Sequence, residues 1–528
     1  MSSIAPADRR WLGHPRGLST LFFTEMWERL SYYGMRGLLL LFLVANIQTG
    51  GFGMTDKVAS AIYGLYVSFV YLFALPGGWI ADRILGQRRA VFVGGCFIAA
   101  GHFSMAIPSA PTFYLGLCLI VIGTGLLKPN VSAMVGDLYP EGGSRRDAGF
   151  SIFYSGINLG AFIGPFICGY LGEKINWHWG FGAAGVGMVL GLIQYALGGK
   201  YLGNAGQRVK GPKGDDTRGA IRMLVVGTLL LAGTAGVLWA MKADIVKVAQ
   251  WAGLFMLALG VLYFASVIFF GGLAPAEKRR VAAIFIFFLA AVLFWAGYEQ
   301  AGSSLNLFAE RLTDRTIFGW DMPASFLQSV NPAFIILFSP VVGILWVRMR
   351  SRVPSTPAKM GYGLVIMALG FLLLAWGATY TVNGVRVSPM WLVGAYFLHT
   401  IGELCLSPVG LSSVTKLSPR RLVGQMMGTW FMGTALGNLI AGLAGGGFAG
   451  MSTSELFRSV GWITGGAGLL LLLCTPLIVR KLIGIENPVP APVEAAPLPD
   501  IPDVPDAPAG RVTVLSKKWL LPEGDQKK

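Results

Sequence analysis

Charged side chains are scarce in this sequence: Asp, Glu, Lys and Arg make up only 13% of its 528 residues. A soluble protein carries about 25% charged residues. Hydrophobic residues make up 54% and gather in long runs, such as 90–107, which holds one His and no formal charge. About 20 apolar residues are enough for a helix to cross a bilayer. The scarcity of charge excludes a soluble protein and predicts a polytopic α-helical membrane protein.

Several other features are absent. The apolar runs do not alternate with polar residues, which excludes a membrane β-barrel. No P-loop, zinc motif or nucleophile elbow occurs, which argues against soluble catalysis and against ATP-driven transport by this chain. The five cysteines stand singly inside apolar runs, so neither a disulfide framework nor a metal-ligand spacing is present.

The net charge of +16 comes from short clusters of Lys and Arg between the apolar runs. There is no basic domain to hold a duplex, so we expect no nucleic-acid partner. The clusters fall on every second loop, as in Arg88-Arg89, Arg145-Arg146 and Arg420-Arg421. Cytoplasmic loops carry such an excess of Lys and Arg. We therefore expect a multi-pass protein of the plasma membrane with both termini in the cytoplasm, which requires an even number of helices.

Fourteen helices are predicted from the apolar runs. They cover 15–46, 56–83, 89–109, 112–138, 147–172, 178–202, 218–241, 246–272, 279–311, 324–349, 359–380, 388–416, 420–449 and 456–483. The predicted order of parts is a cytoplasmic arm (1–14), a six-helix bundle (15–202), a linker with an inserted helical pair (203–278), a second six-helix bundle (279–484) and a Pro-rich, disordered cytoplasmic tail (485–528). Two equivalent bundles place a substrate site between them near the midplane.

The first predicted helix carries buried charge. Glu25, Arg29, Tyr32 and Arg36 are spaced by four, three and four residues and form one helical stripe, and Glu28 adds a second carboxylate. Each charge facing lipid would cost about 2.5–3.5 kcal/mol, so such charges face a protein interior or an aqueous cavity. Two carboxylates beside one arginine can trade a proton against an ion pair. A static network that only fixes packing is the alternative.

Lys128 lies inside the fourth predicted helix, in the run Gly125-Leu-Leu-Lys-Pro-Asn130. A lysine that reaches toward the membrane surface is the alternative to a functional one. The expected partner is a carboxylate from another helix, and Glu299 and Glu403 are the candidates in the second half. Basic groups from one bundle and acidic groups from the other would suit a zwitterionic substrate.

Other candidates are aromatic or lie near these charges. Tyr32, Tyr33, Tyr71, Trp295 and Trp430 line side-chain pockets in one interpretation and serve as core or interfacial residues in the other. Ser407 follows Glu403 by one turn. His399 precedes Glu403 by one turn and is interpreted as a packed or gating residue rather than a ligand.

Four motifs in order give the sequence a family resemblance. They are Glu25-Met-Trp-Glu-Arg-Leu-Ser-Tyr-Tyr-Gly-Met-Arg36, Gly77-Gly-Trp-Ile-Ala-Asp-Arg-Ile-Leu-Gly-Gln-Arg-Arg89, Phe150-Ser-Ile-Phe-Tyr-Ser-Gly-Ile-Asn-Leu-Gly160, and the contexts of Glu403 and Trp430. Together they resemble the proton-dependent oligopeptide transporters, the peptide branch of the major facilitator superfamily. The resemblance covers residues 15 to about 484. It implies a twelve-helix core with an inserted helical pair, as in bacterial members.

The resemblance also implies function: proton-coupled symport of di- and tripeptides by alternating access, with the proton as coupling ion and no cofactor or metal. Its proton-coupling residues would be Glu25, Glu28, Arg29, Lys128 and Glu299. Its substrate-binding residues would be Tyr32, Tyr33, Arg36, Tyr71, Lys128, Asn158, Trp295, Asn331, Glu403, Ser407 and Trp430. Arg36 and Lys128 would face the peptide carboxylate and Glu403 the amino group. Arg36 with Glu299, and Lys128 with Glu403, would be gate pairs.

The sequence departs from the family pattern at two places. Many animal members have a His in the second helix, and none lies between Ala59 and Asp82. Some bacterial members have a second acid directly before the position of Glu299, where this chain has Tyr298. Proton coupling is therefore expected to rest on carboxylates.

Two alternatives remain at the level of sequence. A carrier for nitrate or another small anion belongs to the same superfamily, although the negative charge of Glu403 opposes anion binding. A polytopic membrane enzyme would need a catalytic cluster near one membrane face, whereas the polar groups here lie in mid-helix in both halves. The expected partners are thus a di- or tripeptide, protons and the lipid bilayer.

Overall fold

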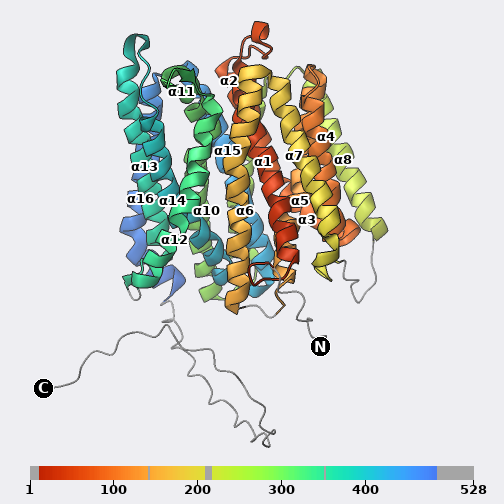
Figure 1. Cartoon of the computed structure of the whole chain (residues 1–528). Coiled ribbons are helices and arrows are strands. Elements are labelled where there is room, and N and C mark those ends of the chain that lie inside the picture. The colour runs from red at the N-terminus through yellow and green to blue at the C-terminus, as the bar shows by residue number, and fades with distance from the viewer. Residues whose placement is uncertain (1–10, 141–142, 208–216, 350–351, 485–528) are drawn as a thin grey trace, which may run out of the picture. The chain divides into compact units, whose positions relative to one another are not determined.

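A computed structural model describes residues 11–140, 143–207, 217–349 and 352–484. Most of the predicted N-terminal arm, part of the linker and the whole Pro-rich tail lie outside the described residues. The described chain is almost entirely helical, as predicted (Figure 1).

The helices follow the order of the predicted spans. The first bundle holds α1 (Gly17–Val44), α2 (Asp56–Leu72) continued by α3 (Ala74–Ile80), α4 (Gln87–Met105), α5 (Ala110–Asp137), α6 (Gly143–Gly169) and α7 (Trp177–Gly198). The inserted pair is α8 (Thr217–Ala240) and α9 (Ile245–Phe270). The second bundle holds α10 (Pro275–Tyr298) continued by α11 (Ser304–Leu312), α12 (Val330–Met349), α13 (Thr356–Ala378), α14 (Met390–Leu417), α15 (Val423–Gly445) and α16 (Thr453–Leu477).

With α2–α3 and α10–α11 each counted as one span, the described residues confirm the fourteen predicted helices. Eleven of them are long and apolar enough to cross a membrane. The charged helix α1 is not among these eleven, because its span contains four ionisable side chains. Short 3₁₀ and π segments join or extend the helices. Those used below are η4 (Tyr170–Ile175), η6 (Glu299–Gly302) and η7 (Ala324–Ser329).

The helices cross the bundle from one end to the other (Figure 1). One end carries the basic connections, with Arg88 at the start of α4 and Arg420 before α15. We call this the basic end. The opposite end, drawn uppermost in Figure 1, carries α11, η7 and the start of α2. There a two-stranded hairpin pairs β1 (Thr316–Ile317) with β2 (Trp320–Asp321).

The sequence did not predict this hairpin. Its two-residue turn is Phe318-Gly319, and both residues have positive φ, 51° and 80°. Such a turn matches the twist of a hairpin and favours glycine. Strands of two residues are too short to give an alternating pattern, which explains why the segment was interpreted as a loop.

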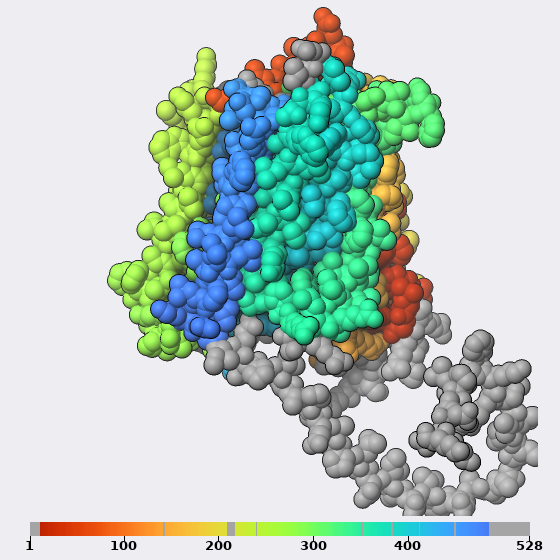
Figure 2. Space-filling model, turned by 90° about the vertical axis from the view of Figure 1, so that its left-hand side faces the viewer, coloured from red at the N-terminus to blue at the C-terminus, as the bar shows by residue number. Residues whose placement is uncertain are grey.

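The two bundles meet along a seam. In it α2 packs against α15, and α6 packs against α12 and η7. Two backbones come close together at Gly64 and Gly442, where a Cβ on Gly442 would lie 2.3 Å from the Cα of Gly64. Only glycine permits two backbones to come so near. The other face of the second bundle is visible in Figure 2, where α16 lies beside α13.

The inserted pair differs from the rest. No part of the most apolar stretch of α8 is buried in the chain, whereas α9 packs against α2 and α15. The apolar stretch of α8 therefore contributes nothing to the bundle core.

Candidate functional site

Three ionisable side chains lie together on α1. Arg29 donates from its guanidinium to the carboxylate of Glu28, and its Nε lies 3.4 Å from Oε1 of Glu25, one turn earlier. All three side chains are at most 2% exposed. Two carboxylates thus share one guanidinium, and Oε2 of Glu25 has no hydrogen-bond partner among the described residues. One added proton would neutralise the excess negative charge, so this cluster is chemically able to take up and release a proton.

Arg36 lies two turns further along α1 and joins the bundles. Its Nη2 lies 2.8 Å from Oε2 of Glu299 in η6, and its Nε donates to the Tyr63 hydroxyl of α2 at 2.7 Å. The break in the helix at η6 brings Glu299 to this position, because α10 ends at Tyr298. Arg36 is only 3% exposed. In this conformation its guanidinium is engaged by Glu299 and Tyr63.

Lys128 lies on α5 and is half-buried. Its Nζ stands 4.1 Å from the ring centre of Tyr71, which provides a cation–π contact. The charged groups that act on it are Arg29, Glu28 and Glu25 on α1, and Glu299. The implied pair with Glu403 is not formed in this conformation.

Glu403 lies on α14 and is 7% exposed. Its carboxyl group interacts with Tyr298 of α10 and Asn331 of α12, while its Oε2 has no hydrogen-bond partner among the described residues. Tyr154 of α6 approaches it from the first bundle. The acid therefore lies where the two bundles face each other, and the described part of the chain supplies it with no basic partner.

The remaining sequence candidates surround these charges. Tyr33 packs edge-on against buried Tyr32, with ring centres 5.2 Å apart, and Trp295 does the same with Tyr298 at 5.2 Å. Asn158 donates to the backbone carbonyl of Tyr154 at 3.0 Å. Half-buried side chains are Tyr33, Tyr71, Trp295, Asn331 and Ser407, whereas Tyr32 and Trp430 are buried.

Several residues at this site were missed from the sequence. Tyr63 accepts the hydrogen bond from Arg36, and Tyr154 is the neighbour of Glu403 from the first bundle. Thr400, one turn before Glu403, accepts a hydrogen bond from Asn331 at 2.8 Å. The position of Thr400, one turn from the acid Glu403 inside a membrane helix, was the sequence signal that could have identified it. No comparable signal marked Tyr63. In the described residues no group of three His, Cys, Asp or Glu side chains is arranged to hold a metal.

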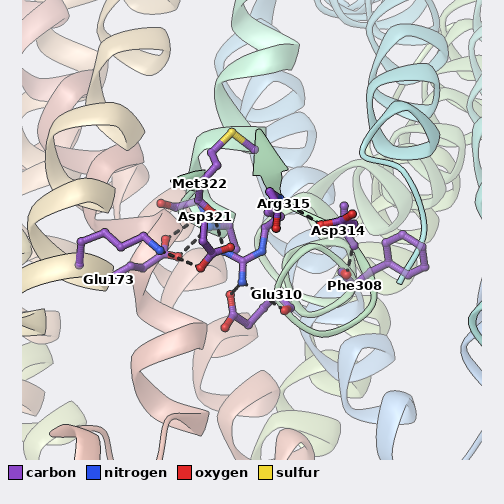
Figure 3. Close-up of polar contacts among 12 residues, drawn as sticks. Glu173, Phe308, Glu310, Asp314, Arg315, Asp321 and Met322 are labelled. Carbon is purple, nitrogen blue, oxygen red and sulfur yellow. Dashed lines mark hydrogen bonds and ion pairs between the residues drawn. The ribbon is translucent and has the colours of Figure 1, made fainter. Parts of the chain in front are cut away.

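A second set of contacts closes the opposite end (Figure 3). Glu173 of η4 accepts from the backbone N–H groups of Ala324 and Ser325, at 2.7 and 3.0 Å, and so caps η7 in the other bundle. Next to it Lys174 forms an ion pair of 2.8 Å with Asp321. We call these five residues the clasp. The Lys174 ammonium holds the pKa of the Asp321 carboxyl, which lies in the hairpin, below its usual range.

Arg315 organises the hairpin side of the clasp. Its guanidinium pairs with Glu310 at 2.9 Å and donates to the backbone carbonyl of Met322 at 2.6 Å (Figure 3). It is 5% exposed. This buried arginine contacts the chain on both sides of the hairpin through its two Nη atoms, which positions Asp321 near Lys174. Arg311 adds a further pair across the seam, 2.7 Å from Asp56.

These features define a class of protein. Two helical bundles meet at a midplane that holds charges of both signs. They are locked together at one end, and a buried carboxylate–arginine cluster lies beside the seam. This is the arrangement of a secondary membrane transporter.

The chain belongs to the POT family, the proton-dependent oligopeptide transporters: the family model matches residues 88–463. It is therefore a transporter and not an enzyme.

Individual members of the family are similar to this chain over most of their length. The peptide transporter YePEPT of Yersinia enterocolitica is 41% identical over 463 residues, which cover 84% of this chain and 90% of that protein. A crystal structure of a peptide transporter POT in complex with sulfate superposes with a TM-score of 0.85 at 39% identity, covering 90% of this chain and 98% of that one. A POT family transporter in complex with 5-aminolevulinic acid gives 0.82 at 33% identity, covering 90% and 99%.

Proposed function

We propose that this protein imports di- and tripeptides together with protons by alternating access. The observation that carries the proposal is the division of charge between the bundles. Lys128 stands on one bundle and Glu403 on the other, and neither has an ion-pair partner in the other bundle within the described residues. A peptide carries one ammonium and one carboxylate at a nearly fixed separation, so it can bridge the two bundles.

Similarity to the relatives supports the substrate class. One relative is called a peptide transporter, and another binds 5-aminolevulinic acid. That compound has an amino group and a carboxylate but no peptide bond. A site that reads the two ends of a ligand would accept both kinds of molecule.

In this proposal Glu403 receives the amino end and Lys128 the carboxylate. Arg36 joins Lys128 once its pair with Glu299 opens. Tyr33, Tyr71, Trp295, Ser407 and Trp430 supply pockets for the side chains, and Asn158 contacts the peptide backbone. Binding to both bundles at once favours the closed state, because only closure brings the two sets of charges together.

Protons are proposed to couple through Glu25, Glu28 and Arg29. The buried cluster has an unpartnered carboxylate oxygen, which is where a proton would be held. The positive-inside rule makes the basic end cytoplasmic, with both termini inside and the clasp facing outward. The conformation described here is then closed toward the outside by the clasp.

Uptake of radiolabelled dialanine into proteoliposomes, with and without a pH gradient, tests the proposal. An acidic outside should drive accumulation, and Glu28→Gln should abolish it while sparing counterflow exchange, which needs no net proton movement. Glu277→Gln is a matched control, because Glu277 only caps α10 by accepting from the Ala274 N–H at 3.0 Å. Accumulation by Glu28→Gln at the wild-type level would mean that the cluster is structural.

A further inference from the structure

A chain of hydrogen bonds with a fixed direction runs through the second bundle. Thr400 donates its hydroxyl proton to the backbone carbonyl of Tyr396 at 2.7 Å. A hydroxyl has one proton, so Thr400 can only accept from Asn331, whose Nδ2 lies 2.8 Å away. This fixes the orientation of the Asn331 amide. Its Oδ1 must face Tyr298, whose hydroxyl donates to it at 2.8 Å.

The direction of this chain has a consequence for Glu403. Because the Tyr298 proton is directed at Asn331, the phenolic oxygen offers only lone pairs to the neighbouring carboxyl group. A protonated Glu403 can donate to that oxygen. An ionised Glu403 has no proton to give, so two sets of lone pairs would face each other in a site that is mostly shielded from water.

We propose that the Tyr298 hydroxyl is a two-position switch, which ties the proton state of Glu403 to the number of acceptors offered to a peptide amino group. When Glu403 is protonated, the Tyr298 hydroxyl occupies Oδ1 of Asn331. When Glu403 loses its proton to water, the hydroxyl turns to the carboxylate and Oδ1 becomes free. The ammonium then meets a carboxylate and a second acceptor together. Thr400 is the positioning residue that keeps Oδ1 on the correct side.

The inference rests on the proposed function, because it assumes that Glu403 receives the amino end. The titratable groups that act on Glu403 are Tyr298 and Glu299 from its own bundle, and Tyr33 and Tyr154 from the first bundle. Glu299 is paired with Arg36, which leaves Tyr298 as the neighbour that responds to the proton. An ionised carboxylate in the place of Tyr298 could not donate to Asn331. The tyrosine at this position is therefore what makes the switch possible.

A double variant of the full-length protein provides the test. Glu403→Gln imitates the protonated acid, so it should weaken dialanine binding about tenfold, the value of one hydrogen bond to a charged group. Adding Tyr298→Phe removes the hydroxyl that blocks Oδ1. Dialanine affinity should then recover about threefold. A structural role for Tyr298 predicts a further loss instead, and that result would overturn the proposal.

The single variant Tyr298→Phe gives an independent readout. In it Oδ1 of Asn331 is free at every pH, so it should bind dialanine more tightly than wild type at acidic pH and about equally at neutral pH. Thr400→Ser keeps the anchor and should behave as wild type, whereas Thr400→Val should weaken dialanine at every pH. A pH profile of Tyr298→Phe that coincides with wild type would exclude the switch.

Calorimetry with N-acetyl-dialanine and dialanine distinguishes a failure of the proposed amino-end recognition from a failure of the Tyr298 switch. Wild type should strongly prefer the free amino group. If wild type binds both ligands equally, the protein does not recognise the amino end, and both the proposed function of Glu403 and the switch are wrong. If the preference exists but the variants weaken both ligands alike, the switch alone is wrong.

Discussion

The opposite end and the middle of the seam differ in whether their charged side chains form ion pairs between the bundles. At the opposite end, ionised groups from one bundle are matched by groups from the other: Arg36 with Glu299 and Lys174 with Asp321. In the middle, Lys128 and Glu403 have no such ion-pair partner among the residues that the structure describes. In the proposed function, the paired charges close a gate, and the charges without an ion-pair partner are available to a ligand. The presence or absence of an ion-pair partner thus distinguishes the proposed gate residues from the proposed binding residues.

Removal of one gate partner should have the largest effect. Arg36→Ala leaves Glu299 buried and uncompensated, which costs about 3–5 kcal/mol. Replacing both residues by leucine should cost much less, because no unpaired charge remains. Thermal unfolding of the purified single and double variants measures the difference. Equal losses would show that side-chain volume, and not charge, holds this part of the seam.

A bulky residue in the seam should open it. Gly442→Leu cannot be accommodated, because even a Cβ would lie 2.3 Å from Gly64 and 2.6 Å from the carbonyl oxygen of Ser60. Overpacking by about 1–3 kcal/mol should raise the labelling rate of a cysteine placed at Ser60 about tenfold. Gly466→Leu is the matched control, since nothing lies within 4 Å of its Cβ. Unchanged labelling would mean that the seam stays closed by other contacts.

A smaller effect is expected for the cap of η7. Glu173→Gln replaces a charged acceptor by a neutral one for the N–H groups of Ala324 and Ser325. The closed conformation should lose about 1 kcal/mol. The cysteine-labelling assay at Ser60 reads this out as a severalfold faster rate. Glu455→Gln is the control: Glu455 caps α16 through Ser452, outside the seam, and should leave labelling unchanged.

The smallest effect is expected at the rim of the clasp. The Asp321 side chain is 54% exposed, so solvent screens its pair with Lys174, and Asp321→Asn should cost at most about 1 kcal/mol. The lowered pKa of Asp321 gives stability that is present above its unpaired value of about 3.9 and lost as pH falls below it. Labelling should therefore be constant between pH 5 and 8. A pH-dependent change that Asp321→Asn removes would contradict this assignment.

Much of the fold could be predicted because long apolar runs in the sequence mark the membrane-spanning helices. An apolar run such as the one that forms α9 has a single structural solution in a bilayer, so its helix was found within a few residues. The stripe of charges on α1 followed from helical spacing alone. The hairpin at Phe318-Gly319 had no such signal, since its strands are two residues long.

Partners were harder to predict than positions. That Arg36 and Glu299 pair came from the family resemblance, and Tyr63 was not suspected because one tyrosine in an apolar helix looks like any other core residue. The pair of Lys128 with Glu403 stays a prediction for another conformation. A single sequence encodes all the conformations of a transporter, and it does not say which pairs are present at the same time.

The glycine contact between α2 and α15 also affects how the seam responds to ionic strength. Salt shortens the screening length from about 10 Å at 0.1 M to about 3 Å at 1 M, which weakens exposed pairs such as Lys174 with Asp321. Backbone against backbone at Gly64 and Gly442 is held by dispersion and close packing, which salt does not screen. The seam thus has a salt-sensitive rim around a salt-insensitive centre. A change of the medium from low to high salt would therefore weaken the exposed ion pairs and leave the glycine contact unchanged.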